Sequence, residues 1–220
     1  MFKRFLYIVI YTIFICAVSI GCTVAYYQYI VLNSDAAPLV RVEDKKVARS
    51  PLKNSDVFVE IMSYGCHFCA INDKAVDELE KRLPEGVRVV RLHINNAGQS
   101  GLARYAPLFA TLEVMGLESQ YREKIYTAVI KDNIDLADDT VLNNWLEHNG
   151  IDVGKYHEIN ASPAVKALLQ YMSAVSNYYD VSATPAFIVN KQWLAYQDRD
   201  FKAFGDQLIS LLTRHKPLEI

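Results

Sequence analysis

The chain has 220 residues, of which 51% are apolar and 22% are charged, a composition typical of a globular protein and one that excludes wholesale disorder. Lys3 and Arg4 are the only charged residues among the first 32, so residues 33–220 contain 21 basic and 25 acidic side chains, a net charge of −4. Because this part has no Lys/Arg-rich run either, nucleic acid is not an expected partner.

The chain begins with a long uncharged segment, FLYIVIYTIFICAVSIGCTVAYYQYIVL, over residues 5–32. About 20 apolar residues span a bilayer as a helix, whereas a cleaved signal has an apolar region of only about 7–15. The basic residues in front favour a cytoplasmic N-terminus. We therefore expect an uncleaved signal-anchor over residues 1–32, a single-pass inner-membrane helix that places the rest of the chain in the periplasm. Cleavage after Ala25 or Ala36 and lipidation of Cys22 are the alternatives, and each of them also exports the domain.

The residues after this segment predict a tether followed by a strand, a helix and a second strand. Residues 33–54 are charged and weakly patterned, which indicates a tether with one short edge strand near residues 39–42. Residues 57–62 are apolar and β-branched and predict a strand, residues 66–83 have the apolar spacing of a helix, and residues 87–94 predict another strand. This order implies two parallel strands joined by a right-handed crossover.

The rest of the chain is predicted to be mainly helical. Four helical patterns, separated by Gly, Asn and Asp breaks, cover residues 97–179. A strand signal returns at residues 186–190, Trp193 belongs to a following strand, and residues 200–213 form an amphipathic helix. The predicted fold class is α/β, in the order β-α-β, four helices, β-β, α.

Cys66 and Cys69 are the only cysteines of the exported part, and they lie between a predicted strand and a predicted helix. In an oxidising compartment two such cysteines are expected to pair with each other. Because unpaired N–H groups and the macrodipole at a helix N-terminus stabilise a thiolate, Cys66 is the expected nucleophile and Cys69 the resolving cysteine. His67 adds a cation next to Cys66, and Phe68 gives an apolar rim for unfolded substrate.

Other interpretations of the pair are weaker. A haem-attachment motif needs His directly after the second cysteine, where Ala70 stands. Structural zinc needs four ligands, and the other histidines are scattered, so we expect neither a metal nor a cofactor. A lone structural disulfide at this spacing closes a loop too small to stabilise the fold much. Zinc and a structural disulfide stay open as alternatives to a redox pair.

Two charged residues interrupt the predicted apolar strands, and a proline precedes the third strand. Glu60 either lies on a solvated face or is buried near the cysteines, where a raised pKa would let it exchange protons with Cys69. Arg91 could pair with it. Thr184 and Pro185 directly precede the strand at residues 186–190, where proline is unusual; the sequence alone favours an ordinary trans turn.

Together the motifs EIMSYGCHFC, RLHIN and VSATPAFIVN resemble those of the DsbA-type branch of the thioredoxin superfamily, over about residues 55–214. The resemblance implies that Glu60 and Arg91 form a buried charged pair, and that Thr184 and Pro185 form a cis-proline element facing the disulfide. It also implies a thioredoxin-like fold with an inserted all-helical domain, which the N-terminal transmembrane helix predicted above would precede. With the signal-anchor (1–32) and the tether (33–54) predicted from the apolar segment and the composition, the expected divisions are 55–96 and 180–220 thioredoxin-like domain, and 97–179 inserted helical domain.

The function implied by this resemblance is that of an enzyme, a membrane-anchored periplasmic thiol-disulfide oxidoreductase. It would donate the Cys66–Cys69 disulfide to exported proteins with free cysteines, be reoxidised by a DsbB-like membrane oxidant, and act as a monomer. The sequence departs from the family pattern in having His-Phe rather than Pro-His between the cysteines, and Thr184 is more typical of isomerases. The alternatives are a reductase or isomerase kept reduced by a membrane electron donor, and a non-catalytic chaperone or copper-binding module.

Overall fold

The structure is a computed structural model that describes residues 2–26, 37–96 and 101–218. It divides into two units, Met1–Ala37 and Pro38–Ile220, which are described separately. The first unit contains the helix α1 (Phe2–Tyr26). Among the described residues, no helix is long and apolar enough to cross a membrane. The membrane segment predicted at residues 5–32 ends outside the described residues.

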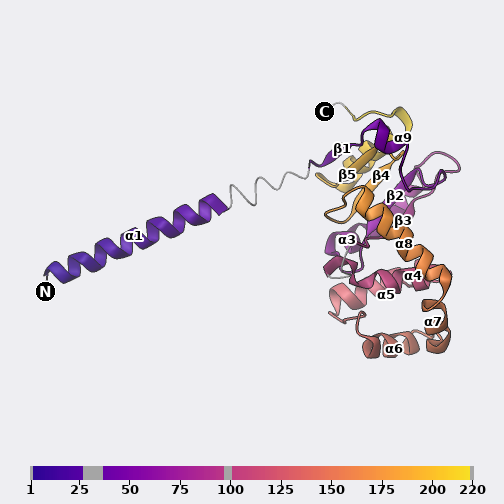
Figure 1. Ribbon diagram of the computed structural model, residues 1–220, viewed down its shortest axis with the longest axis horizontal. Coiled ribbons are helices and arrows are strands. Elements are labelled where there is room, and N and C mark those ends of the chain that lie inside the picture. The colour runs from indigo at the N-terminus through magenta and orange to yellow at the C-terminus, as the bar shows by residue number, and fades with distance from the viewer. Residues whose placement is uncertain (1, 27–36, 97–100, 219–220) are drawn as a thin grey trace. The chain divides into compact units, whose positions relative to one another are not determined.

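The second unit is built on a five-stranded mixed sheet with the strand order β1-β5-β4-β2-β3 (Figure 1). β2 and β3 pair in parallel as predicted, and the other neighbouring strands are antiparallel. Residues of β2 and β4 are buried on both faces, which explains their nearly continuous apolar sequences. The strands are β1 (Leu39–Arg41), β2 (Phe58–Met62), β3 (Val90–His93), β4 (Ala186–Val189) and β5 (Trp193–Tyr196).

Two helices cover one face of this sheet. α3 (His67–Glu80) connects β2 to β3, and α9 (Phe201–Arg214) follows β5. Their buried side chains form one core cluster with those of β2 and β4, in which Phe204 packs edge-on against Phe187 with ring centroids 5.5 Å apart. The apolar side of α9 is therefore buried against the sheet. α3 packs on the same face, and its N-terminus directly follows the loop after β2.

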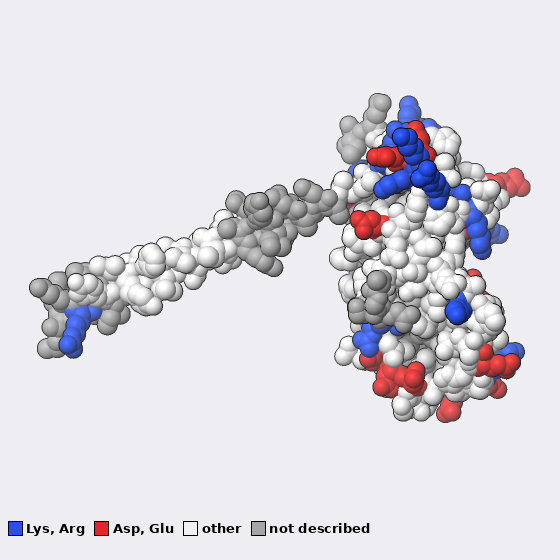
Figure 2. Space-filling view, in the orientation of Figure 1, with Lys and Arg blue, Asp and Glu red and all other residues white. Residues whose placement is uncertain are grey.

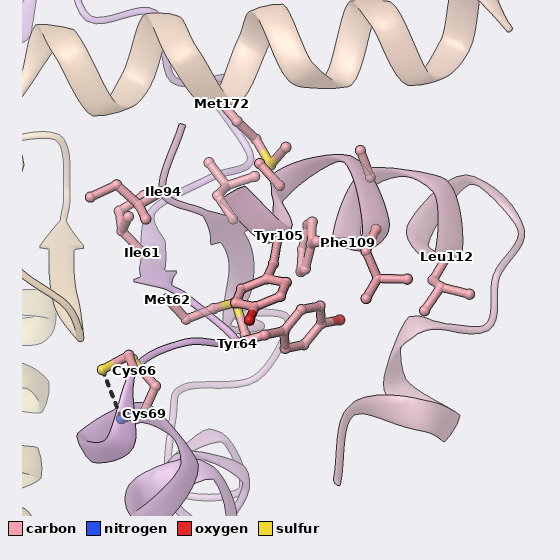
Figure 3. Packing of buried hydrophobic residues seen from close by; sticks show 14 of the residues in the cluster. Ile61, Met62, Tyr64, Cys66, Cys69, Ile94, Tyr105, Phe109, Leu112 and Met172 are labelled. Atoms are coloured by element: carbon pink, nitrogen blue, oxygen red, sulfur yellow. Dashed lines mark hydrogen bonds between the residues drawn. The ribbon is translucent and has the colours of Figure 1, made fainter. Parts of the chain in front are cut away.

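The other face carries the helical segment, which we define as residues 101–178. Its buried residues, such as Phe109 and Met172, form a second core cluster with Ile61 of β2 (Figure 3). Figure 1 shows α6 and α7 at the opposite end of the unit from β1 and α9. The elements are the 3₁₀ helix η2 (Gly101–Tyr105), α4 (Ala106–Val114), α5 (Glu118–Tyr126), the π-helical turn η3 (Thr127–Lys131), α6 (Asp139–His148), α7 (Val153–Asn160) and α8 (Pro163–Tyr178).

The prediction of four helices in this part is wrong by one, because α7 was missed. α7 buries only Tyr156 among its eight residues, so it has no apolar stripe that could signal a helix. The helix predicted at residues 66–83 ends at Glu80, since Arg82 and Leu83 donate to carbonyls three residues back and form a tighter turn. The strand predicted from residue 87 begins at Val90, the first partner of β2.

Residues 38–54 of the predicted tether belong to the second unit, so the prediction of a tether is wrong for them. β1, the predicted edge strand, pairs with β5, and the short helix α2 (Asp44–Val47) follows it. Leu52 is buried, and Ser50 hydrogen-bonds Tyr179 of the chain after α8 (2.7 Å). The division of residues 55–220 into a thioredoxin-like part and an inserted part stays a prediction.

The charged side chains are unevenly placed on the face that Figure 2 shows. Lys and Arg gather near the end that carries β1 and α9 in Figure 1, and Asp and Glu occur mainly toward the end that carries α6 and α7. Uncharged atoms cover most of the surface between these ends. This view shows no continuous basic surface of the kind that binds a phosphate backbone.

Candidate active site

Cys66 lies where β2 passes into α3. The chain leaves the strand through Ser63, Tyr64 and Gly65, and Cys66 is then the N-cap residue of α3. Its Sγ accepts a hydrogen bond from the backbone N–H of Cys69 at 3.1 Å (Figure 3). The helix therefore begins with an N–H group directed at the sulfur, which is the arrangement expected to stabilise a thiolate.

Both cysteines are free thiols, so the geometry is that of the dithiol form. Hydrogen bonding, first of all from the Cys69 side chain and then from Thr184, lowers the pKa of Cys66 to about 6, against the opposing effect of burial. Burial, followed by the hydrogen bond to Cys66, raises the pKa of Cys69. Cys69 therefore keeps its proton when Cys66 is a thiolate. Among the described residues, no group of three or more His, Cys, Asp or Glu side chains is placed to hold a metal ion.

Thr184 and Pro185 lie opposite Cys66, although they are more than a hundred residues away in sequence. The peptide bond between them is cis, not trans as the sequence alone favours. The Cys66 thiol donates to the Thr184 carbonyl at 3.2 Å. The Thr184 hydroxyl is buried and has no partner of ordinary hydrogen-bond geometry within the described part of the chain. Thr184 nevertheless lowers the pKa of Cys66, the effect expected of a hydroxyl that turns toward the sulfur when the thiolate forms.

Glu60 is buried beneath the site, and the solvated alternative for it is wrong. Only 3% of its surface is exposed, and it lies opposite Arg91 in the parallel β2–β3 register. Arg91 Nε donates to Glu60 Oε2 at 3.0 Å. Burial raises the pKa of Glu60 to about 7, although Arg91 lowers it, and the charge of Glu60 contributes to the raised pKa of Cys69. The two side chains are thus together as predicted, while proton exchange with Cys69 stays a prediction.

Apolar surface flanks the nucleophile on two sides. Phe68 is 65% exposed and, with Pro185, Tyr196 and others, lines a groove of about 430 Å³. Ile71 is 61% exposed and lines a second cleft, of about 330 Å³, between α3 and the end of α5. These are the two most exposed large apolar side chains in the described part of the second unit. His67 is exposed and also lines the second cleft; its expected influence on Cys66 stays a prediction.

Sequence reasoning missed the residues that hold the loop before Cys66. The backbone N–H of Tyr64 donates to Nε2 of His93 at 3.2 Å, and Nδ1 of that ring lies 2.9 Å from the carbonyl oxygen of Ile94. Burial lowers the pKa of His93 to about 4, so near neutral pH the ring is uncharged and can accept this bond. The Ser63 hydroxyl donates to the carbonyl of Leu102 at 2.6 Å. The sequence signal that could have indicated these contacts is His93, a polar residue at the end of β3.

The Tyr64 side chain points away from the cysteines into the core (Figure 3). Its ring packs against Phe109, and its hydroxyl donates to Oε1 of Glu118 at 2.9 Å. Glu118 in turn accepts hydrogen bonds from Arg122, and both residues are buried. Because these partners are separated by 54 residues, no local pattern pointed to them.

Comparison with known proteins confirms the resemblance that the motifs suggested. The chain is 27% identical over 135 residues to the thiol:disulfide interchange protein DsbA of Pseudomonas aeruginosa, which covers 61% of this chain and 63% of that protein. It is 23% identical over 171 residues to the thiol:disulfide interchange protein DsbL of Escherichia coli, covering 70% and 77%. The chain thus spans less than two thirds of the length of that DsbA relative.

Solved structures show the same fold. DsbA from Xylella fastidiosa matches with a TM-score of 0.67 at 18% identity, over 81% of this chain and 95% of that one. DsbA from Klebsiella pneumoniae matches with a TM-score of 0.63 at 21% identity, over 82% and 96%. The DSBA-like thioredoxin domain family matches residues 57–213, which include both cysteines and the cis-proline. The chain therefore belongs to the family of DSBA-like thioredoxin domains.

Proposed function

We propose that this protein is a thiol-disulfide oxidoreductase that donates the Cys66–Cys69 disulfide to exported proteins. The observation that carries the proposal is the position of Cys66 at the N-terminus of α3, where its Sγ accepts the Cys69 N–H at 3.1 Å and lies beside the cis Thr184–Pro185 bond. The same surroundings lower the pKa of Cys66 to about 6 and raise that of Cys69, so the thiolate is favoured on Cys66. The names of the DsbA and DsbL relatives support the same activity.

The proposed reaction begins with the oxidised pair. A substrate thiolate attacks Sγ of Cys66, so that a mixed disulfide forms and the Cys66–Cys69 bond breaks; Cys69 leaves with the electron pair and takes up a proton. A second substrate thiolate then attacks the substrate sulfur of the mixed disulfide, the substrate disulfide forms, and Cys66 leaves as a thiolate. Two electrons pass from the substrate dithiol to the cysteine pair. The low pKa of Cys66 makes it a good leaving group.

The same low pKa favours donation over reduction as the direction of exchange. A stabilised thiolate stabilises the reduced pair, and a pair whose reduced form is stabilised is a strong oxidant. The reductase or isomerase alternative would require a reduced form that is stabilised less. The hydrogen bond from the Cys69 N–H to the Cys66 sulfur argues against that, as does the lowering of the Cys66 pKa by Cys69 and Thr184.

The substrate that fits this surface is an extended polypeptide with apolar residues near its cysteine. Phe68 and Ile71 offer apolar contacts on two sides of Cys66, and neither is covered by the described part of the chain. A folded substrate would bury such residues in its own core, whereas an unfolded chain presents them. This supports exported proteins that are still folding as the substrates.

We further propose that residues 1–32 hold the protein at the periplasmic side of the inner membrane, where a DsbB-like membrane protein reoxidises it. The protein is proposed to act as a monomer. The support is in the sequence: 28 uncharged residues follow Lys3 and Arg4. Membrane fractions of cells producing the full chain would retain the protein after an alkaline wash if the segment anchors it. Release into the soluble fraction would show that the segment is cleaved or does not span the membrane.

The decisive experiment is the reduction potential of the Cys66–Cys69 couple in the full chain, equilibrated against glutathione in detergent. A potential of about −120 mV would identify a disulfide donor, and one of about −270 mV would identify a reductant supplied from the membrane. A pair that glutathione does not reduce would be structural, which would leave the chaperone alternative. The Cys66→Ala variant, which removes exchange but not the apolar surface, then separates catalysis from peptide binding.

A further inference from the structure

A chain of polar side chains, buried at Tyr64, Glu118 and Arg122 and half exposed at Asp77, links α5 of the helical segment to both sides of the nucleophile. On one side, the hydroxyl of Tyr64, two residues before Cys66, donates to Oε1 of Glu118 at 2.9 Å. Tyr64 is fully buried and Glu118 is 3% exposed, so water does not compete for this bond. The loop before the nucleophile is thus attached to a helix that lies outside the β2–α3–β3 unit.

On the other side, the link continues into α3, the helix that begins after Cys66. Arg122, one turn after Glu118, donates to both of its carboxylate oxygens, through Nε at 2.9 and 3.1 Å and through Nη2 at 2.7 Å. Nη1 of Arg122 lies 3.4 Å from Oδ1 of Asp73 and 3.7 Å from Oδ1 of Asp77, both on α3. Asp77 also accepts from Arg91, the partner of Glu60.

Such a largely buried ionic chain is a poor source of stability, because removing the charges from water offsets most of their attraction. Its strength lies in geometry, since a guanidinium held at both ends by carboxylates fixes the distance between the elements that carry them. Here those elements are α5, α3 and, through Tyr64, the loop at residues 63–65. Cys66 lies between this loop and α3, so both of its neighbouring elements are joined to α5.

We propose that Glu118 and Arg122 are positioning residues for Cys66, which act through Tyr64 and Asp73 to keep the sulfur aligned with the N–H of Cys69. The proposal rests on the proposed function, in that it concerns the same nucleophile. The helical segment then has a part in the exchange reaction without contacting the reacting atoms. If the alignment is lost, the hydrogen bond from Cys69 to the sulfur weakens and the thiolate is less favoured.

The test uses variants that leave the net charge unchanged. Tyr64→Phe removes only the hydroxyl that Glu118 holds, and Arg122→Lys keeps the charge but not the forked contact with Glu118 and Asp73. Tyr121→Phe is the matched control, since it removes from the same helix a hydroxyl that donates to the Asn149 carbonyl at 3.0 Å, away from the loop. The readouts are the thiolate titration of Cys66 in the full-length reduced protein, by ultraviolet absorbance, and the unfolding midpoint in urea.

For Tyr64→Phe and Arg122→Lys, we expect the thiolate titration of Cys66 to move to higher pH, so that the thiolate fraction at pH 6 falls from about one half to about one tenth. The equilibrium constant with glutathione would change about tenfold, or about 30 mV, toward a more reducing pair. Tyr121→Phe should lower the unfolding midpoint but leave both values unchanged.

The proposal is overturned if the two variants lower the unfolding midpoint but titrate like the wild type, or if Tyr121→Phe moves the titration as far as they do. The titration does not depend on turnover. A wild-type protein without exchange activity would therefore refute the proposed function, while the titration would still decide whether Glu118 and Arg122 position the sulfur.

Discussion

Replacing Glu60 by Gln should make the protein progressively more stable, relative to the wild type, as the pH rises from about 4.5 to 7. Burial raises the pKa of Glu60 from 4.5 to about 7 in the folded protein, so the folded state holds a proton that the unfolded state has released. Stability from this group is complete below the unfolded pKa and is lost as the pH rises through the folded pKa. With one pKa unit worth about 1.4 kcal/mol, the loss is roughly 3 kcal/mol.

Gln has nearly the shape of the protonated carboxyl group and still offers an oxygen to Nε of Arg91. The variant is therefore expected to fold, and to be more stable than the wild type above pH 7 rather than less. Urea unfolding of the dithiol form of both proteins, measured at several pH values from 4.5 to 8, gives this difference in stability. His93 and Cys66, whose lowered pKa values make stability increase with pH, are present in both proteins, so their contributions cancel. The matched control is Glu123→Gln, which removes an exposed carboxylate of α5 that pairs with Lys74 on the surface.

The reasoning fails if the difference in stability between Glu60→Gln and the wild type is the same at every pH across this range. Glu60 would then titrate at the same pKa in the folded and the unfolded protein. A second consequence of the substitution can be read from Cys69. The charge of Glu60 contributes to the raised pKa of that thiol, so the variant should form the Cys69 thiolate more readily. Alkylation of Cys69 at high pH, under conditions in which the protein stays folded, should therefore be faster in the variant.

Thr184→Val should raise the pKa of Cys66 by roughly one unit and make the couple about 30 mV more reducing, because the substitution removes the hydroxyl that favours the thiolate but keeps the side-chain volume. Equilibration with glutathione measures the potential, and an unchanged value would exclude the hydroxyl as a donor to the sulfur. Phe68→Ala should slow exchange with an apolar cysteine-containing peptide about tenfold and leave exchange with glutathione unchanged, because only the peptide reaches the groove beside Pro185. Stopped-flow assays measure both rates, and equal slowing of the two substrates would contradict a binding role for this side chain.

Local signals account for the part of the site that the sequence predicts. The positions of Cys66 and Cys69 follow from a strand and a helix that are each readable over a few residues, and the burial of Glu60 opposite Arg91 follows once their strands are parallel neighbours. The cis state of the bond before Pro185 needed the family resemblance, because sequence alone favours trans.

The rest of the site depends on contacts between residues far apart in sequence, which no local sequence pattern indicates. Tyr64 meets Glu118 across 54 residues, and neither position differs from an ordinary core tyrosine or helix-start glutamate when read alone. α7 was missed for the related reason that it buries one side chain and so lacks a periodic pattern. In both cases the tertiary packing of the helical segment, rather than its local sequence, decides the structure.

The edge position of β1 determines how a mechanical load would enter the protein. A pull on the chain before Pro38 is carried first by the three residue pairs that join β1 to β5, between Leu39 and Ala195 at one end and Arg41 and Trp193 at the other. β5 and β4 stand between that ladder and β2, which leads to Cys66. Peeling of β1 would therefore lengthen the chain in front of the domain by a few residues while the strands around the two sulfurs keep their register.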